Sequence, residues 1–419
     1  MAQGMSDAEA RAAAVDLLRA LVTDSERPLT GISVAWLNGE SSISRAWAGW
    51  RSISAEHPVG SLPIEANTLF RVASVSKLAQ TLAALRLHDA KVLDLDSDIS
   101  GLLRAPVRHP RFLQIPITPR MLLTHRSGLL DHLALPLPSG EALRRALADS
   151  SNWGPETPGQ RFRYGNLGMV LLATVMEAAA RQPFDALMQR WLFDPLGITA
   201  RYSPATLSPT QRGQLATLYR RPDGATRWLP QIDIPGEGPH AYATDAALGT
   251  VGENASVHSP HGGLRISVPD LARLARFIML QGRWEGRRLL TADTYLQMVS
   301  PQSIVGASSP GDTTGGLFRS WGLGLQHFSD VFDAQGGDRL HPNGGVRGFG
   351  QLGSAYGLLS GLIVVPATGT QPARGLVYVI NGTSQGAIDS PGQHSSLRRS
   401  EERVIESLLD ILASSKDTR

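Results

Sequence analysis

The chain has 419 residues, 42% of them hydrophobic, with 40 Lys plus Arg, 37 Asp plus Glu and no Cys. This length implies two or three domains, or one large domain with an insertion. The lack of Cys excludes a disulfide scaffold, a thiolate zinc site, an iron–sulfur cluster and a cysteine nucleophile. A net charge of +3 on so long a chain is too small to indicate a nucleic-acid groove, so no nucleic-acid partner is expected.

The first 25 residues have the apolar spacing of an amphipathic helix, which includes Leu18 and Leu21. They lack the basic start and the apolar stretch of a signal peptide. The protein is therefore expected to be cytoplasmic as the sequence stands, and periplasmic if a leader has been removed. No run of 18 apolar residues occurs, so no membrane span is expected.

Two β-type runs follow, at residues 31–37 and 43–50, and Asn38-Gly39 between them accepts the positive φ values of a tight hairpin turn. The apolar spacing then becomes helical. Four more helices are expected, from about residue 75, at 167–179, at 184–191 and after Pro269. Late strands at 358–365 and 375–380 precede a closing helix at 401–412.

This order, with strands at both ends and helices between, predicts an α/β layer built from the two termini and an all-helical insertion. The sheet domain is expected at residues 1–72 and 316–419, and the mostly helical domain at 73–315. Clefts between two such domains are common positions for active sites and ligand-binding sites.

The segment 221–263 is rich in Gly and Pro and has no clear period, which is typical of a functional lid or a mobile loop. It contains His240, His258 and His261. Because these histidines lie in a loop without carboxylates at helical spacing, no metal site is expected there. A fourth histidine, His125, is expected to be a structural hydrogen-bonding residue.

Ser74 and Lys77 lie where the strand pattern changes to a helical one. Residues three apart share a helix face, so the Lys77 amine can reach the Ser74 hydroxyl. The helix N-terminus offers unpaired N–H groups to a developing oxyanion, and apolar neighbours such as Leu78 and Leu82 lower the pKa of the amine by desolvation. The alternative is an ordinary helix start, with Ser as the cap and Lys in solvent.

Tyr164-Gly165-Asn166 is the only Tyr-x-Asn sequence in the chain. Tyr164 can relay the proton of Ser74 if a nearby ammonium lowers the pKa of the phenol, and Asn166 can hold Lys77 or a substrate carbonyl through its amide. The alternative is a core tyrosine with a tethered hydroxyl.

A glycine-rich segment at residues 341–350 precedes the last strands. Paired glycines on an edge strand let a substrate lie against bare backbone, and one N–H there could complete an oxyanion hole. The alternative is a simple turn. The sequence at 348–353 matches Gly-x-Gly-x-x-Gly, but no βαβ unit surrounds it, so a dinucleotide is not expected.

Together these motifs resemble those of the serine penicillin-recognising superfamily, which includes class C β-lactamases, D-Ala-D-Ala carboxypeptidases and family VIII carboxylesterases. The resemblance extends from about residue 68 to 365 and includes LLTHRSGL at 122–129, PGQRF at 158–162, DPLG at 194–197 and GGL at 262–264. It implies an antiparallel sheet flanked by the N- and C-terminal helices, with the all-helical insertion.

By this resemblance Ser74 is the acylated nucleophile, Lys77 and Tyr164 share the proton transfers, and Asn166 orients Lys77 and the substrate. The N–H groups of Ser74 and Val346 would form the oxyanion hole.

The superfamily's third motif, Lys-Thr-Gly or His-Thr-Gly, can be placed in two registers. Placing Asn343 first keeps the third glycine, Gly345, and is preferred, whereas placing His341 first keeps the histidine. Neither register supplies a fixed positive charge, although the Arg347 guanidinium could replace it.

The resemblance implies a serine hydrolase with an acyl-enzyme on Ser74 and no cofactor. We expect a carboxylesterase for small esters, because the missing third-motif lysine removes the handle for an anionic substrate. The alternatives are a D-amino-acid peptidase or amidase, a β-lactamase in which Arg347 holds the carboxylate, and a non-catalytic member that binds a ligand. The expected partner is a small-molecule ester or amide, and the sequence does not fix the oligomeric state.

Overall fold

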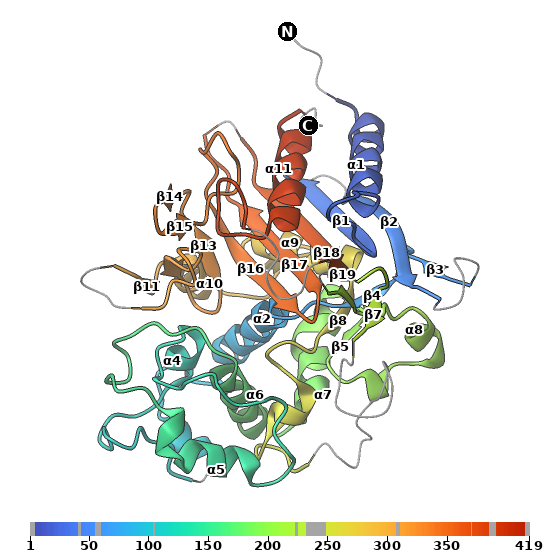
Figure 1. Cartoon of the computed structure of the whole chain (residues 1–419). Coiled ribbons are helices and arrows are strands. Elements are labelled where there is room, and N and C mark those ends of the chain that lie inside the picture. Colours follow the sequence, from blue (N-terminus) through green and yellow to red (C-terminus); the bar gives the residue numbers. More distant parts are fainter. Residues whose placement is uncertain are drawn as a thin grey trace.

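A large twisted sheet with helices on both faces forms the upper half of the molecule in Figure 1. The computed structural model describes residues 5–40, 43–54, 60–103, 105–222, 225–231, 249–306, 311–369, 371–384 and 391–414. Within these residues the sheet has nine strands in the order β11-β12-β13-β16-β17-β18-β1-β2-β3. All neighbouring strands in it are antiparallel.

The strands of this sheet are β1 (Gly31–Asn38), β2 (Ser44–Ser52), β3 (Leu62–Pro63), β11 (Ser303–Ile304), β12 (Ser320–Trp321), β13 (Gln326–Phe328), β16 (Gly348–Ala355), β17 (Leu358–Val365) and β18 (Arg374–Ile380). The helices are α1 (Asp7–Val22), α2 (Val75–Asp89), α3 (Ile99–Leu103), α4 (Pro119–Leu123), α5 (Ala142–Ala148), α6 (Leu167–Ala180), α7 (Phe184–Met188), α8 (Pro209–Gly213), α9 (Val268–Met279), α10 (Ala292–Val299) and α11 (Arg399–Ser414). Small sheets are formed by β4 (Leu69–Arg71), β5 (Ala200–Arg201) and β8 (Arg265–Ser267), by β6 (Tyr219–Arg221), β7 (Leu229–Pro230) and β19 (Gly382–Ser384), by β9 (Arg283–Trp284) and β10 (Arg287–Arg288), and by β14 (Phe332–Asp333) and β15 (Gly336–Gly337).

The central strands are apolar throughout because both faces of the sheet are covered. Every residue of β17 is buried. Successive side chains of a strand point to opposite faces, so Leu359 and Ile363 join the core under α1 and α11. Leu362 and Val364 join the other core, which contains the apolar faces of α2 and α9.

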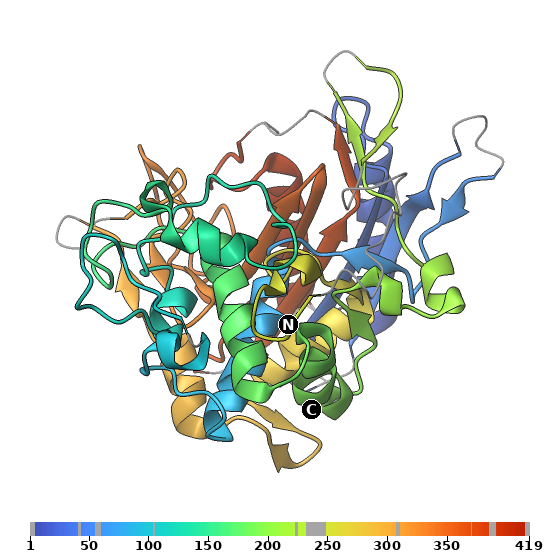
Figure 2. The same ribbon diagram turned by 90° about the horizontal axis from the view of Figure 1, so that it is seen from below.

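The helical half of the molecule is built on α2 and α6, which lie below the sheet in Figure 1 and contact each other. Figure 2 shows this half from below. Both helices are buried around most of their circumference, and residues 167–177 of α6 are buried without exception. Such helices need neighbours on all sides. The chain enters α2 from β4, which is an edge strand of the antiparallel sheet β4-β8-β5.

The expected fold class is confirmed: an antiparallel sheet is flanked by the terminal helices, with the helices of the middle segment below it. The division at residues 72 and 315 stays a prediction. Two elements inside 73–315 belong to the sheet half, because β11 is its edge strand and α9 packs against β18.

Parts of the expected loop at 221–263 are ordered into β7 and a 3-10 turn at Ala255–His258, whereas His240 lies outside the described residues. The helix expected at 184–191 is α7 followed by a π-helical turn at Gln189–Phe193. Among the described helices none combines the length and apolarity that a membrane crossing requires.

Candidate active site

Ser74 lies at a sharp bend between β4 and α2. The preceding residue, Ala73, has a φ of +42°, a left-handed conformation that costs a non-glycine residue about 1–2 kcal/mol. Ser74 itself occupies the N-cap position of α2, yet its side chain makes no capping hydrogen bond. The hydroxyl is therefore available to other groups. Within the described residues its backbone N–H also has no acceptor.

Lys77, one helical turn later, is 1% exposed. Its Nζ donates to Ser74 Oγ at 2.9 Å, to Asn166 Oδ1 at 2.7 Å and to the His261 carbonyl oxygen at 2.8 Å. These three acceptors match the three protons of an ammonium. Burial lowers the pKa of Lys77 to about 7, although the nearby Asp131 carboxylate acts in the opposite direction.

Tyr164 forms one wall of the site within an aromatic cluster. Its ring centroid lies 4.7 Å from that of His125 and 4.9 Å from that of Phe318, and the Lys77 Nζ is 5.1 Å from the Tyr164 centroid. Burial raises the pKa of the Tyr164 phenol well above its usual value, and a side-chain hydrogen bond with Ser74 only partly offsets this. The expected lowering of that pKa by an ammonium is therefore not found. Tyr164 is a protonated phenol at neutral pH.

Asn166 precedes α6 and is held by Asp131. Its backbone N–H donates to Asp131 Oδ1 at 2.7 Å, and its Nδ2 donates to Asp131 Oδ2 at 2.8 Å. The remaining amide atom, Oδ1, faces Lys77. The structure thus brings Ser74, Lys77, Tyr164 and Asn166 together. The spacing in the sequence predicted the contact of Ser74 with Lys77, and the family resemblance implied that Tyr164 and Asn166 join them.

Strand β16 closes the other side of the site. A Cβ added at Gly353 would lie 2.5 Å from the Val72 carbonyl oxygen and 3.1 Å from the Ser74 nitrogen, so only glycine fits there. Two residues earlier and on the same face, Gln351 Nε2 donates to the Tyr164 hydroxyl at 3.5 Å. Gln351 and Gly353 therefore line the site beside Tyr164 and Ser74.

The neighbouring strand β13 pairs with Gly348–Gly350 only, and no described strand pairs with that edge of β16 further along. The backbone beside Gly353 is thus an open strand edge. Such an edge offers N–H and carbonyl groups to an extended ligand.

The segment predicted to hold the third motif lies elsewhere. His341 Nε2 is 3.1 Å from Asp410 Oδ1 on α11, the Gly345 N–H donates to Asp330 Oδ2 at 2.7 Å, and Val346 packs in the core under α1 and α11. Asn343 and Arg347 are exposed.

The physical reason is the length of β16. Five residues of this strand separate Gly348 from Gly353, which corresponds to about 17 Å. Both registers proposed for His341 and Asn343 are therefore corrected, and Val346 does not supply the second oxyanion donor.

The sequence interpretation missed Gln351, Gly353 and Asp131. Gly353 is the last glycine of the Gly-x-Gly-x-x-Gly match, which was considered only as a dinucleotide motif. Its position shortly before the buried strand β17 is the signal that could have identified it. Asp131 follows the LLTHRSGL motif, and no sequence pattern around it indicated a functional role.

The histidines have structural surroundings. Burial, with the Lys77 charge as a second cause, lowers the pKa of His125 to about 3, and the ring packs against Tyr164. His261 contributes its carbonyl oxygen to Lys77, while His258 Nε2 is 3.5 Å from Glu177 Oε1. In the described part of the chain no three His, Asp or Glu side chains are arranged to hold a metal ion.

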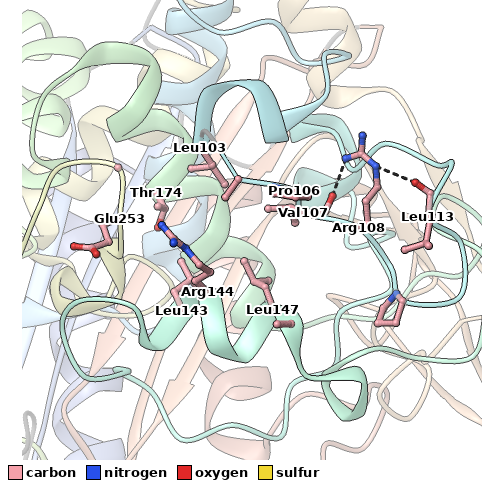
Figure 3. Close-up of a pocket in the computed structure, with 14 residues that line it drawn as sticks. Leu103, Pro106, Val107, Arg108, Leu113, Leu143, Arg144, Leu147, Thr174 and Glu253 are labelled. Carbon is pink, nitrogen blue, oxygen red and sulfur yellow. Dashed lines mark hydrogen bonds between the residues drawn. The ribbon is translucent and has the colours of Figure 1, made fainter.

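A separate cavity of about 270 Å³ lies between α3, α5 and α6 (Figure 3). Apolar side chains, among them Leu103, Val107, Leu143 and Leu147, line it together with Thr174. None of the four clustered residues of the Ser74 site contributes to its wall.

Known proteins share both the sequence pattern and the fold. Penicillin-binding protein 4 of Amycolatopsis lactamdurans is 26% identical over 74% of this chain and 72% of its own length. Esterase EstB of Burkholderia gladioli is 26% identical over 84% of this chain and 87% of its own.

Two solved structures show the same fold. A class C beta lactamase from Rhodobacter sphaeroides has a TM-score of 0.68 at 16% identity, covering 96% of this chain and 99% of that one. A D-amino acid amidase from Ochrobactrum anthropi has a TM-score of 0.67 at 19% identity, covering 97% and 100%.

The fold and these relatives define a serine hydrolase of the β-lactamase and transpeptidase type. The family model described as Beta-lactamase matches residues 14–393, which is most of the chain. The protein belongs to the beta-lactamase family.

Proposed function

We propose that the protein hydrolyses small, neutral carboxylic esters through an acyl-enzyme on Ser74. One observation carries this proposal: the buried Lys77 Nζ lies 2.9 Å from Ser74 Oγ, and burial lowers the pKa of Lys77 to about 7. An amine of this pKa is neutral in about half of the molecules at pH 7, so it can accept the hydroxyl proton.

In the proposed reaction Ser74 Oγ attacks the ester carbonyl while its proton moves to Lys77. The negative charge that develops on the carbonyl oxygen is stabilised by the unpaired Ser74 N–H and by an N–H of the open β16 edge. Tyr164, which is protonated at neutral pH, gives its proton to the leaving alkoxide and regains one from the Lys77 ammonium. Water then attacks the acyl-enzyme by the reverse route and releases the acid.

The preference for neutral esters rests on Gln351. We infer that Gln351-Leu352-Gly353 is the third motif, because Gln351 and Gly353 lie beside Tyr164 and Ser74. A neutral amide then takes the place of the lysine of Lys-Thr-Gly, so the position offers no positive charge to a carboxylate. Arg347, the other candidate for that task, lies before β16 and is exposed. The relative named as an esterase, which matches over 84% of this chain, is consistent with this preference.

A D-peptidase, amidase or β-lactamase activity is the second candidate, because the similar proteins include a penicillin-binding protein and a D-amino acid amidase. A non-catalytic member is disfavoured, since the hydroxyl, the amine and the phenol are all present and in contact.

The test compares the wild type with Ser74→Ala. We expect the wild type to react with a fluorophosphonate and to hydrolyse p-nitrophenyl acetate, and Ser74→Ala to do neither. Labelling that survives in Ser74→Ala would remove Ser74 from the mechanism. The substrate class is tested by comparing kcat/KM for short p-nitrophenyl esters, nitrocefin, a D-Ala-D-Ala peptide and D-phenylalanine amide. A higher kcat/KM for one of the last three would overturn the preference for esters.

A further inference from the structure

Asp131 lies outside the Ser74–Lys77–Tyr164 cluster and contacts it through Asn166. Its Oδ1 accepts from the backbone N–H groups of Asn166 at 2.7 Å and Leu167 at 3.3 Å. An aspartate that served only as a cap for α6 would need no more than these contacts. Here the second oxygen, Oδ2, also accepts from the Asn166 side chain at 2.8 Å.

These contacts determine which way the Asn166 amide faces. An ionised carboxylate only accepts hydrogen bonds, so the amide must turn its NH₂ toward Asp131. Its oxygen is then left for Lys77, whose Nζ donates to it at 2.7 Å. If the amide were reversed, it would place an NH₂ against the Lys77 ammonium, which has no acceptor, and an oxygen against the Asp131 carboxylate. Both contacts would be repulsive.

We propose that Asp131 is a positioning residue for the nucleophile: it fixes the Asn166 amide, which fixes the Lys77 amine against Ser74 Oγ. In addition, the Asp131 carboxylate acts on the pKa of Lys77 in the direction opposite to burial. This proposal rests on the proposed function. It adds a residue that acts through another one and touches no reacting atom.

The charge of Asp131 has few competitors around Lys77. The groups that face the amine from α2, α6 and the neighbouring segments are Ser74, Tyr164, Asn166, His125 and His261. Burial holds the pKa of both histidines below the usual value, and burial raises that of Tyr164, so these three rings are neutral at pH 7. Arg71 faces His261 and donates to the Gly262 carbonyl oxygen. Asp131 is the anion that acts on Lys77.

The test uses Asp131→Asn, which keeps the size and removes the charge. Asp131 is exposed, so the change removes no core contact. The asparagine has one acceptor oxygen in place of two and cannot hold both the backbone N–H and the side chain of Asn166. Asp149→Asn is the matched control, because Asp149 is also exposed and also accepts a backbone N–H, from Ser151 at 2.9 Å.

The readout is the second-order rate constant for fluorophosphonate labelling as a function of pH, which needs no knowledge of the natural substrate. We expect Asp131→Asn to lower the rate constant on its high-pH plateau by roughly 10-fold to 100-fold, because the Lys77 amine is then misplaced relative to Ser74 Oγ. We also expect the acid limb to move to lower pH by about half a unit, because the charged form of Lys77 has lost a neighbouring anion. Asp149→Asn should follow the wild type in both respects.

A double-mutant cycle with Asn166→Ala separates the two effects. If Asp131 acts through Asn166, then Asp131→Asn lowers the plateau little further in the Asn166→Ala background, while the acid limb still moves. The proposal would be overturned if the losses of high-pH labelling rate caused by Asp131→Asn and Asn166→Ala multiplied in full in the double variant. It would also be overturned if the acid side of the pH profile did not move in Asp131→Asn. Failure of the function itself has another signature, namely labelling that persists in Ser74→Ala.

Discussion

Lys77 is buried in the protein, and the loss of hydration destabilises its protonated form. Three acceptors partly compensate this cost, and the result is a pKa of about 7 in place of 10.5. The amine is therefore protonated below pH 7 and largely neutral above it. This makes Lys77 better suited than Tyr164 to accept the serine proton, because burial raises the pKa of the phenol away from neutrality.

The first prediction at this scale is a pH dependence. Activity should fall as the pH decreases through about 7, because protonation of Lys77 removes the base, and it should reach a plateau above that pH. The measurement is kcat/KM for p-nitrophenyl acetate between pH 5 and 9, with the background hydrolysis subtracted. Lys77→Arg keeps a charge that cannot be lost and should be inactive over the whole range. A flat profile in the wild type would contradict the assignment.

The second prediction concerns the contact between Gly353 and the nucleophile. Gly353→Ala should lower the labelling rate by about 100-fold, because the added Cβ would push β16 away from Ser74. Gly101→Ala is the control, since nothing lies within 4 Å of a Cβ there. Equal labelling rates in the two variants would show that β16 does not support the site.

At the scale of elements, the site is assembled where α2, the start of α6 and β16 meet. The spacing of Ser74 and Lys77 is local to one helix, so the sequence predicted their contact correctly. The third motif could not be placed in the same way, because a glycine-rich segment has little side-chain pattern to define a strand register. The register became visible only through contacts of Gly353 and Gln351 with residues more than 180 positions away.

The third prediction tests whether the third motif is Gln351-Leu352-Gly353 or begins at His341 or Asn343. Gln351→Ala should slow ester turnover by about 10-fold, because the Tyr164 hydroxyl loses its neighbour. His341→Ala and Asn343→Ala should leave kcat within about twofold of the wild type, since His341 contacts α11 and Asn343 is exposed. A large loss in either of these two variants would favour a third motif that begins at His341 or Asn343.

At the scale of the whole molecule, the sheet separates two cores. One contains the helices next to the Ser74 site and the other lies under α1 and α11. The apolar β-type runs near both ends of the chain, with helical patterns between them, predicted this layered fold from the sequence. The aromatic wall around Tyr164 was not predicted, because Phe318 and Trp321 lie more than 150 positions after Tyr164 in the sequence.

The fourth prediction tests the independence of the two cores. Tyr378 lies under α11, and its hydroxyl donates to Glu401 Oε1 at 2.8 Å. Tyr378→Phe should destabilise the fold by about 1–3 kcal/mol, because the buried carboxylate loses a donor. The labelling rate of Ser74 at 25 °C should not change. Urea denaturation and labelling on the same samples check both statements, and a coupled loss would show that the sheet transmits the change.

The left-handed bend at Ala73 bears on how ligands should be sought. Backbone contacts before and after it, from Val72 to the Leu264 carbonyl oxygen and from Ser76 to the Ala73 carbonyl oxygen, hold the bend in place. The backbone of the protein itself therefore sets the direction of the Ser74 hydroxyl. Covalent inhibitors can accordingly be designed with the electrophile placed first, at Ser74 Oγ, and the rest of the molecule extended outward from it.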